Sequence, residues 1–242
     1  MKNSRILIVG GNGYLGKHLS NKMDTSNHIF ITGTQKLNID NYFQIDFDNL
    51  DTYKVLEGNK FDLVIILAAK ISGIGKVNLD NDVLHSNTFN YSLFLEYIKS
   101  ISLTDKIIFS SSMTVYAKQN TIPVIESGNL SPLSVYGLSK MLAENITSFF
   151  CNTSDIKGLT LRLPGIYGGD RNSGIIYNTA KKCLEDKEII LNTQGLGYWE
   201  TIEVNDLCHL IVSLMCKYKW EKSYETINVC YGERTDICET AD

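Results

Sequence analysis

Three side chains in this sequence are of types that can together move a proton and hold an oxygen atom: Ser112, Tyr136 and Lys140. Tyr136 and Lys140 lie four residues apart at the start of a predicted helix, so they share one face of it. Tyrosine ionises at about pH 10, and a neighbouring ammonium favours the phenolate and lowers that pKa. A tyrosine tuned in this way can exchange a proton with a sugar or alcohol hydroxyl. Ser112, at the end of the preceding predicted strand, can hold the reacting oxygen.

A tyrosine and a lysine at this spacing often lie on an exposed helix face and do nothing, so a second feature is needed. Gly10, Gly13 and Gly16 follow the apolar run 6–9 and precede helical spacing over 17–23. A strand, a glycine turn and a helix in this order form a phosphate-binding device, because the free N–H groups and dipole of the helix favour an anion. The alternative is a glycine-rich turn that binds no ligand.

The elements that must position these residues alternate along the chain. Apolar runs predict strands over 6–9, 28–32, 43–47, 62–69, 106–110 (continuing toward 116), 159–163 and 226–229. Helical spacing occurs over 17–23, 51–57, 81–101, 135–150, 175–185 and 206–218. Buried strands that alternate with helices predict the α/β class, with a doubly wound parallel sheet.

The end of the second predicted strand indicates which dinucleotide would bind. A fold selective for NAD usually has Asp or Glu there, which holds the ribose 2′-hydroxyl. Here the chain carries Gly33, Thr34 and Lys36 instead. A hydroxyl and a cation would face a 2′-phosphate, so we expect NADP to be preferred, with NAD possible. The alternative is that Lys36 is only a solvated loop residue.

Composition excludes several classes of function. The chain has 242 residues and a net charge of −4, which gives no electrostatic footprint for nucleic acid. No apolar run approaches the roughly 20 residues of a membrane span. The first predicted strand begins close to the first residue, so we expect no signal peptide. The six cysteines form no C-x-x-C pair and the four histidines are scattered, so we expect reduced thiols, no metal site and a cytoplasmic protein.

The motifs along the chain resemble those of one family. The sequence is similar to the extended short-chain dehydrogenases/reductases, in the NAD-dependent epimerase/dehydratase family, whose members act mostly on nucleotide sugars. The matching pieces are GGNGYLG (10–16), IDF (45–47), LAAK (67–70), Asn87, FSSSMTVY (109–116), SVYGLSK (134–140), LRLPGIYG (161–168) and IEVNDL (202–207). The run AAKISGI (68–74) is also similar to a stretch of GDP-fucose synthases.

This resemblance implies a Rossmann domain over 1–163 and a small substrate-binding part over 164–242, interleaved with the last Rossmann helix and strand and apparently shortened at its C-terminus. It makes Ser112, Tyr136 and Lys140 the catalytic triad and a nucleotide-linked sugar the substrate. The expected dinucleotide ligands are Gly10, Gly13, Tyr14, Leu15, Gly16, Gly33, Thr34, Lys36, Asp46, Phe47, Leu67, Ala68, Ala69, Asn87, Ser110, Tyr136, Lys140, Pro164 and Ile166. Thr114 and Arg171 are the expected substrate contacts.

Departures from the family pattern narrow the chemistry. Family 4,6-dehydratases carry an Asp-Glu pair where this chain has Met113 and Thr114, and neither of these can protonate a leaving hydroxyl. Thr114 also replaces the cysteine that GDP-fucose synthases use for 3,5-epimerisation. Keto-reduction and 4-epimerisation remain, since both need only hydride transfer and the Ser-Tyr-Lys set.

A non-catalytic dinucleotide-binding sensor or scaffold is the alternative function. It is favoured by the residues 198–201, Tyr-Trp-Glu-Thr, where many relatives carry an arginine that binds the substrate diphosphate. Gly165 likewise replaces a common asparagine, and Arg171 could substitute for the missing arginine. The resemblance further implies a homodimer. Its interface would use apolar stripes on two predicted helices, namely Phe89, Leu93 and Tyr97 on one and Leu142, Ile146 and Phe149 on the other.

Overall fold

A seven-stranded parallel sheet forms the centre of the protein. The computed structural model describes residues 2–71, 78–116, 123–185, 188, 198–232 and 235–236. In spatial order the strands are β10 (Tyr224–Asn228), β6 (Lys157–Leu163), β5 (Lys106–Ser112), β4 (Leu63–Ile66), β1 (Arg5–Val9), β2 (His28–Gly33) and β3 (Tyr42–Gln44). The chain order reverses between β1 and β4, which confirms the predicted doubly wound α/β fold. In such sheets, ligands bind beyond the carboxyl ends of the strands at this reversal.

The central strands are apolar on both faces because helices cover both. In β1, Ile6 and Ile8 pack with one core cluster, whereas Leu7 and Val9 pack with the other. All four side chains are at most 1% exposed. This burial explains why these strands read as continuous apolar runs rather than as alternating patterns.

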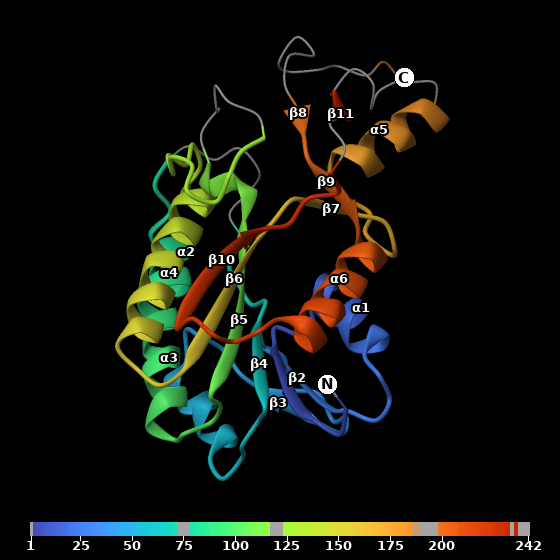
Figure 1. Cartoon of the computed structure of the whole chain (residues 1–242). Coiled ribbons are helices and arrows are strands. Elements are labelled where there is room, and N and C mark those ends of the chain that lie inside the picture. Colours follow the sequence, from blue (N-terminus) through green and yellow to red (C-terminus); the bar gives the residue numbers. More distant parts are fainter. Residues whose placement is uncertain are drawn as a thin grey trace.

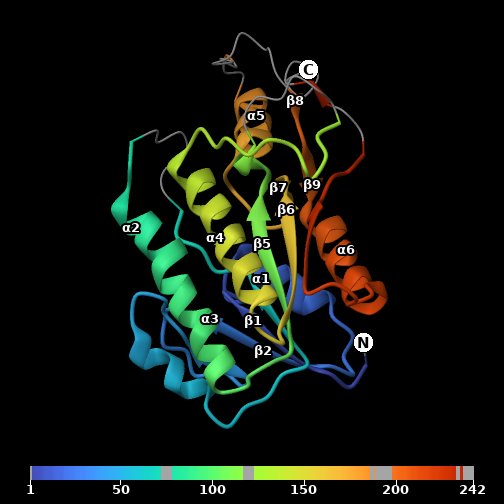
Figure 2. The ribbon, with the colours of Figure 1, turned by 60° about the vertical axis from the view of Figure 1, so that its left-hand side comes forward.

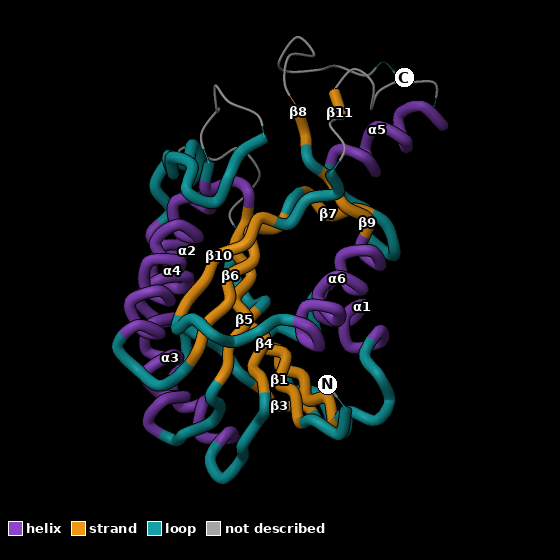
Figure 3. The backbone as a smooth tube through the Cα atoms, viewed as in Figure 1, coloured by secondary structure: helices purple, strands orange, loops and turns teal. Residues whose placement is uncertain are grey.

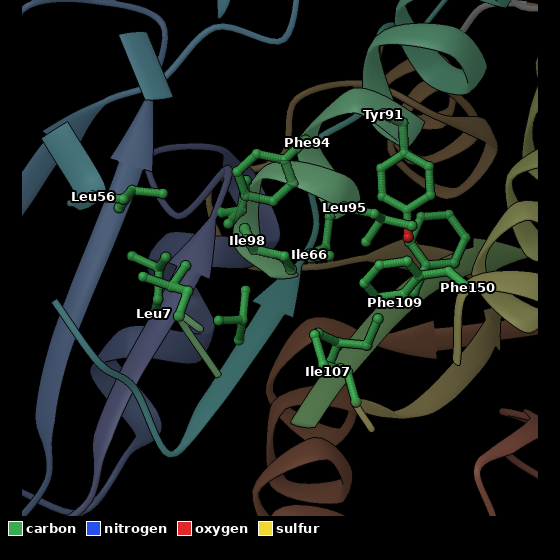
Figure 4. Packing of buried hydrophobic residues seen from close by; sticks show 14 of the residues in the cluster. Leu7, Leu56, Ile66, Tyr91, Phe94, Leu95, Ile98, Ile107, Phe109 and Phe150 are labelled. Atoms are coloured by element: carbon green, nitrogen blue, oxygen red, sulfur yellow. The ribbon is translucent and has the colours of Figure 1, made fainter. Parts of the chain in front are cut away.

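Two layers of helices enclose the sheet (Figures 1 and 2). One face carries α1 (Tyr14–Lys22) and α6 (Val204–Lys217), and the other carries α3 (Tyr91–Ser100) and α4 (Val135–Asn152). Figure 4 shows the core on the α3 side, where Phe94 and Ile98 lie near Leu7 and Ile66 of the sheet. This packing fixes α4, which carries Tyr136 and Lys140, against β5 and β6.

Figure 3 shows the helices and strands of the structure, several of which differ from the sequence-based predictions. The strand expected to continue from 106 toward 116 ends at Ser112 and is followed by a 3-10 turn, and the strand expected over 62–69 ends at Ile66. The third strand ends at Gln44, so Asp46 and Phe47 follow it instead of closing it. Residues Leu50–Leu56 form a 3-10 helix, η1. The expected long helix over 81–101 is α2 (Asn81–Leu84), then a π-helical segment η2 (His85–Asn90), then α3. The π-turn matters because it contains Asn87.

The chain after β6 divides between the main layers and a smaller region at the carboxyl edge of the sheet (Figure 1). The smaller region contains β7 (Gly165–Tyr167), which pairs in parallel with β9 (Thr201–Glu203), and the antiparallel pair β8 (Tyr198–Trp199) and β11 (Thr235–Asp236). It also contains α5 (Ile175–Leu184), in which no side chain is fully buried. Between these pieces, α6 and β10 return to the main fold.

The helices, metal-binding side chains and cysteines of the described residues can be compared with the sequence-based expectations. Among the described residues no helix is long and apolar enough to cross a membrane, and no group of His, Cys, Asp and Glu could hold a metal ion. Five cysteines are free thiols, as expected: Cys151, Cys183, Cys208, Cys216 and Cys230. Cys238 and the residues 72–77, which include part of the AAKISGI run, lie outside the described residues.

Candidate active site

The glycine turn between β1 and α1 is built for close approach. Gly10 has φ +81°, and a Cβ there would lie 2.7 Å from the backbone nitrogen of Ala68. At Gly16 a Cβ would lie 2.5 Å from the Cα of Gly11, so only glycine lets α1 start so close to the turn. Thr32 of β2 fixes the turn from the side, because its hydroxyl accepts from Gly10 N at 3.1 Å and its carbonyl from Asn12 N at 3.0 Å.

The start of α1 fits the pyrophosphate of a dinucleotide. Its N-cap is Gly13, which brings no side-chain cap, and its first turn contains no acidic residue. The first-turn N–H groups have no intrahelical carbonyl to bond, and the helix dipole adds a positive partial charge. An anion of the size of a phosphate therefore finds backbone donors here, and the first turn of α1 places no carboxylate among them.

The expected ribose and adenine side lies at the ends of β2 and β3. Thr34 and Lys36 are exposed, and the carbonyl of Thr34 accepts from Gln44 Nε2 at 3.0 Å. Gly33 is crowded, because a Cβ there would lie 3.0 Å from both Asn12 Cβ and Tyr42 Oη. Asp46 is partly buried, and its carboxylate accepts from Asp48 N at 3.0 Å.

Phe47 is placed differently from a ligand contact. Its side chain is 8% exposed and lies within the aromatic cluster of Tyr53, Tyr91 and Phe94. The backbone of Phe47 remains the part that could face an adenine.

A series of contacts joins the glycine turn to the helix that carries Tyr136 and Lys140. Leu67 and Ala68 each donate a backbone N–H to the carbonyl of Val9, at 2.9 and 3.0 Å. Lys70, three residues after Leu67, makes two backbone hydrogen bonds to the side chain of Asn87. The N–H of Lys70 donates to Asn87 Oδ1 at 2.7 Å, and Asn87 Nδ2 donates to the carbonyl of Lys70 at 2.8 Å. Ala69, between them, is partly buried.

Asn87 extends this connection to α4. Its Nδ2 also donates to the hydroxyl of Ser139 at 3.0 Å, and the side chain is 5% exposed. Ser139 lies directly before Lys140 and in turn donates to the carbonyl of Tyr136 at 2.8 Å. The side-chain amide of Asn87 holds the loop after β4 against α4, and its expected contact with the dinucleotide stays a prediction.

Lys140 and Tyr136 share one face of α4, as their spacing predicts. Lys140 is 2% exposed, its Nζ donates to the carbonyl of Ser110 at 2.6 Å, and it lies 4.7 Å from the ring centroid of Phe109 and 5.9 Å from that of Tyr136. Burial lowers the pKa of Lys140 to about 7, against an opposing effect of Glu144. Ser110, expected as a cofactor contact, is thus the backbone anchor of the lysine.

The expectation that Lys140 lowers the pKa of Tyr136 is wrong for the protein's own groups. Burial raises the pKa of Tyr136 to about 12 instead. A buried phenol surrounded by few charges favours its neutral form, and a lysine whose own pKa lies about 7 supplies only a partial charge near neutrality. Tyr136 is therefore protonated near neutral pH when no further positive charge lies beside it.

Ser112 ends β5 and caps the short 3-10 turn η3 (Met113–Val115). Its Oγ accepts from the N–H of Thr114 at 3.2 Å and from the hydroxyl of Thr114 at 3.0 Å. Thr114 is exposed and Ser112 partly buried. Helix α4 packs closely on this turn because residue 137 is glycine: a Cβ at Gly137 would lie 2.3 Å from the carbonyl oxygen of Thr114.

The chain after β6 reaches back over the start of α1. Tyr14 Oη donates to the carbonyl of Gly168 at 2.8 Å, and burial raises the pKa of Tyr14 to about 12. Arg171 lies 5.4 Å from the Tyr14 ring centroid and donates to the carbonyl of Ile166 at 2.8 Å. Arg171 therefore lies beside the glycine turn, closer to the dinucleotide end than its expected role at the substrate implied.

Three further residues expected to contact the dinucleotide pack against the rest of the protein. Leu15 and Ile166 pack on the core cluster of the α1 and α6 face. Pro164 is buried between β6 and β7. Sequence reasoning missed Thr32 and Gly137. A signal existed for each, since one is a buried hydroxyl at the end of a strand and the other a glycine inside a helix between two catalytic candidates.

The chain matches known proteins over most of its length. Residues 6–230 match the NAD dependent epimerase/dehydratase family. A Methanocaldococcus jannaschii protein named "Putative UDP-glucose 4-epimerase" is 28% identical over 98% of this chain and 80% of its own length. The dTDP-4-dehydro-6-deoxyglucose reductase of Escherichia coli is 27% identical over 94% of this chain and 77% of its own.

A solved structure gives a similar match. It is the UDP-N-acetylglucosamine 4-epimerase of Methanobrevibacter ruminantium in complex with UDP-N-acetylmuramic acid, with a TM-score of 0.81 and 25% identity over 98% of this chain and 80% of that one. The fold is therefore shared over nearly the whole chain.

Proposed function

Because this chain belongs to the NAD dependent epimerase/dehydratase family, we propose that it inverts C4 of a nucleotide-linked sugar by hydride transfer to and from a bound dinucleotide. The observation that carries the proposal is the junction of two features. Asn87 ties the loop beside the glycine turn to α4, so the dinucleotide-binding end and the Tyr136–Lys140 pair share one edge of the sheet. The family relationship supports an activity on sugar nucleotides.

The proposed steps assign one task to each side chain. When bound, the dinucleotide supplies an oxidant that takes a hydride from C4 and returns it. Tyr136 would act as the phenolate that Lys140 and a bound nicotinamide favour: it takes the proton of the C4 hydroxyl when the hydride leaves and returns it when the hydride comes back, while Ser112 holds the C4 oxygen. Lys140 holds a ribose hydroxyl and becomes more fully charged when a phenolate forms beside it.

Reversal of configuration needs the oxidised sugar to turn so that the hydride returns to the opposite face of its C4. This requires no further acid or base. Met113 and Thr114 provide no acidic pair next to Ser112, which is why we propose no loss of water. Thr114 Oγ1 donates to Ser112 Oγ at 3.0 Å and can also accept a bond from the sugar. Keto-reduction is the second candidate, and the match to an Escherichia coli reductase favours it.

The dinucleotide preference is a finer part of the proposal. Members of the family are described as NAD dependent. Exposed Thr34 and Lys36, with no Asp or Glu over 32–36, support NADP(H) over NAD(H) for this chain. We keep Arg171 as a contact to a phosphate group, and its place on the Tyr14 ring supports the dinucleotide as its target.

The experiment is incubation of the protein and each dinucleotide with a panel of uridine and deoxythymidine diphosphate sugars. Formation of the 4-epimer, read by chromatography and proton NMR, is the expected result. A 4-keto-6-deoxy product would instead show dehydration. Tight dinucleotide binding without turnover of any 4-hydroxy or 4-keto sugar nucleotide would favour the sensor or scaffold.

Two further parts of the proposal concern organisation. We propose residues 164–242 as the substrate-binding part, apart from α6 and β10. We also propose a homodimer through the η2–α3 segment and α4, supported by the exposed side chains of Phe89 (55%) in η2 and of Leu142 (37%) and Phe149 (72%) in α4. Tyr97 and Ile146, expected in the same stripes, pack against this chain's own core instead. Light scattering at micromolar concentration tests the dimer.

A further inference from the structure

A buried ion pair lies one helical turn from Lys140. Arg162 of β6 and Glu144 of α4 are 5% and 3% exposed. Arg162 Nη2 donates to Glu144 Oε2 at 2.7 Å, and Nε donates to Oε1 and Oε2 at 3.0 and 3.2 Å. A guanidinium fork of this kind fixes direction as well as distance.

Stability alone gives no reason for such a pair. Desolvation of two charges offsets most of their attraction, so replacing both by apolar residues is often neutral or stabilising. Removing one partner is costly, because a buried charge is then left unpaired. The pair is therefore better explained by the arrangement it holds than by the free energy of unfolding it supplies.

Ser112, Tyr136 and Lys140 lie at the carboxyl edge of the sheet, the catalytic edge. Arg162 also makes contacts on the Ser112 side of this edge. Its Nη1 donates to Tyr116 Oη and, at 2.9 Å, to the carbonyl of Glu126. The guanidinium also lies over the Tyr116 ring, 4.9 Å from its centroid. Tyr116 follows the η3 turn, which begins directly after Ser112.

Tyr116 in turn connects to β10. Its hydroxyl donates to Asn228 Oδ1 at 2.8 Å. Asn228 donates from Nδ2 to the carbonyl of Val124 at 2.9 Å and from its N–H to Glu126 Oε1 at 2.9 Å. The segment 123–131 is thus fixed to the same network, and it returns to the η3 turn through Ser131 N and the carbonyl of Val115 at 3.1 Å.

We propose that Glu144, Arg162 and Tyr116 form a positioning unit that holds Ser112 and the η3 turn at a fixed distance from Tyr136 and Lys140. The unit rests on the proposed function, since it serves the same catalytic edge. It acts through α4 on one side and through Tyr116 on the other, and none of its three side chains is required to touch substrate. The effect of Glu144 on the pKa of Lys140, which opposes that of burial, is a second route by which the unit supports the site.

Tyr116→Phe is the first test, because it removes only the hydroxyl that joins Arg162 to Asn228. Tyr218→Phe is the matched control. Its hydroxyl donates to Glu225 Oε2 at 2.6 Å, and it lies after the C-terminal end of α6, away from the catalytic edge. We expect Tyr116→Phe to lower kcat about tenfold and to leave the dinucleotide Kd within about twofold, since misplaced reacting groups slow chemistry without weakening remote binding.

The second test separates positioning from stability. The double variant Glu144→Leu with Arg162→Met removes both charges and leaves none unpaired. We expect this variant to stay folded, with a Tm close to that of the wild type. Its kcat should nevertheless be at least about tenfold lower than that of the wild type. A double variant with wild-type kcat would overturn the proposal, as would a Tyr116→Phe variant that matches the control.

Hydrogen exchange gives a readout that does not depend on turnover. Amide exchange over 112–116 should be faster in Tyr116→Phe than in Tyr218→Phe, with α1 unchanged in both. If the wild type turns over no sugar nucleotide, the proposed function fails, and exchange alone decides on the positioning unit. Equal exchange in the two variants would then overturn it, and a double variant that does not fold leaves the decision to Tyr116→Phe.

Discussion

The proposed active site has a dinucleotide half and a sugar half, and the two are built from different kinds of chemical group. The dinucleotide half, around Gly10 and the start of α1, uses backbone groups that lie next to one another in sequence. The sugar half, around Ser112 and Tyr136, uses side chains brought together from five separate elements. A site built from backbone groups is sensitive to added side-chain atoms, but it has no titratable group and is insensitive to pH. A site built from side chains depends on their charge, burial and hydrogen bonds. The two halves should therefore fail in different ways.

The largest expected effect is on the sugar half. Tyr136→Phe removes one oxygen from a partly buried ring and leaves its packing in place. It should lower kcat about 10²–10⁴-fold, because a positioned acid–base group contributes that much. The dinucleotide Kd, from fluorescence titration, should stay within about twofold. An equal loss in kcat and in dinucleotide affinity would show that the two halves are not separable.

The dinucleotide half is broken by sterics. Gly10→Ala places a Cβ 2.7 Å from the Ala68 nitrogen, at φ +81°. Gly58→Ala is the matched control, since Gly58 has φ +75° but nothing within 4 Å of its Cβ position. Both should lose roughly 1–2 kcal/mol from backbone strain. Only Gly10→Ala should lose more stability and bind the dinucleotide about a hundredfold more weakly, as measured by denaturant unfolding and titration.

If both glycine variants bind the dinucleotide equally well, close approach of the turn to Ala68 is not what shapes that site. The same result would leave the sugar half unaffected, because Tyr136 and Lys140 are anchored through α4 and Ser110.

Charge should make the sugar half sensitive to pH. Burial lowers the pKa of Lys140 from its usual 10.5 to about 7. Between these values the unfolded chain holds a proton that the folded chain lacks, so stability rises with pH, by at most about 1.4 kcal/mol per pH unit. Tyr136, whose pKa is raised to about 12, contributes no pH dependence below pH 10. The stability difference between wild type and Lys140→Met should therefore increase from pH 7.5 to pH 9.5 in urea unfolding.

Gly10→Ala serves as the control for this pH series. Its stability difference from the wild type should be the same at both pH values, because it changes backbone packing and no titratable group. A Lys140→Met difference that is also constant would mean that Lys140 keeps its ordinary pKa in the folded protein.

The smallest expected effect concerns selectivity within the dinucleotide half. Lys36→Glu should weaken NADPH binding about tenfold and leave NADH binding within about twofold, because only NADPH carries the 2′-phosphate. Lys60→Glu, an equal change of charge at another exposed position, should alter neither affinity. Gly33→Asp would be a poor probe of selectivity, since Asn12 and Tyr42 leave little room for a Cβ at this position. Equal NADPH binding by both variants would remove Lys36 from the site.

The contrast between the halves also explains what the sequence could predict. The glycine turn, β1 and α1 were predictable because their signals are local: an apolar run, glycines at fixed spacing and helical periodicity. Tyr136 and Lys140 were predictable for the same reason, since four residues on one helix determine a shared face.

The remainder of the sugar half was not predictable because it depends on distant contacts. Nothing near Arg162 in sequence indicates that it meets Glu144 and Tyr116, although an arginine inside the apolar run LTLRL could have signalled a buried partner. The pKa of Tyr136 went the opposite way to the expectation because burial depends on the whole fold. Asn87 lies in the π-turn and bonds to Lys70 and Ser139, and periodicity shows neither the turn nor these bonds.

The most direct test of the account is epimerisation of the active sugar nucleotide in heavy water, followed by proton NMR at C4. Hydride removal and return at one carbon should give the 4-epimer with its C4 hydrogen retained and no deuterium incorporated there. The same preparation of Tyr136→Phe should give almost no product. Deuterium at C4 would contradict the account, because it would require a proton taken from C4 and replaced from solvent.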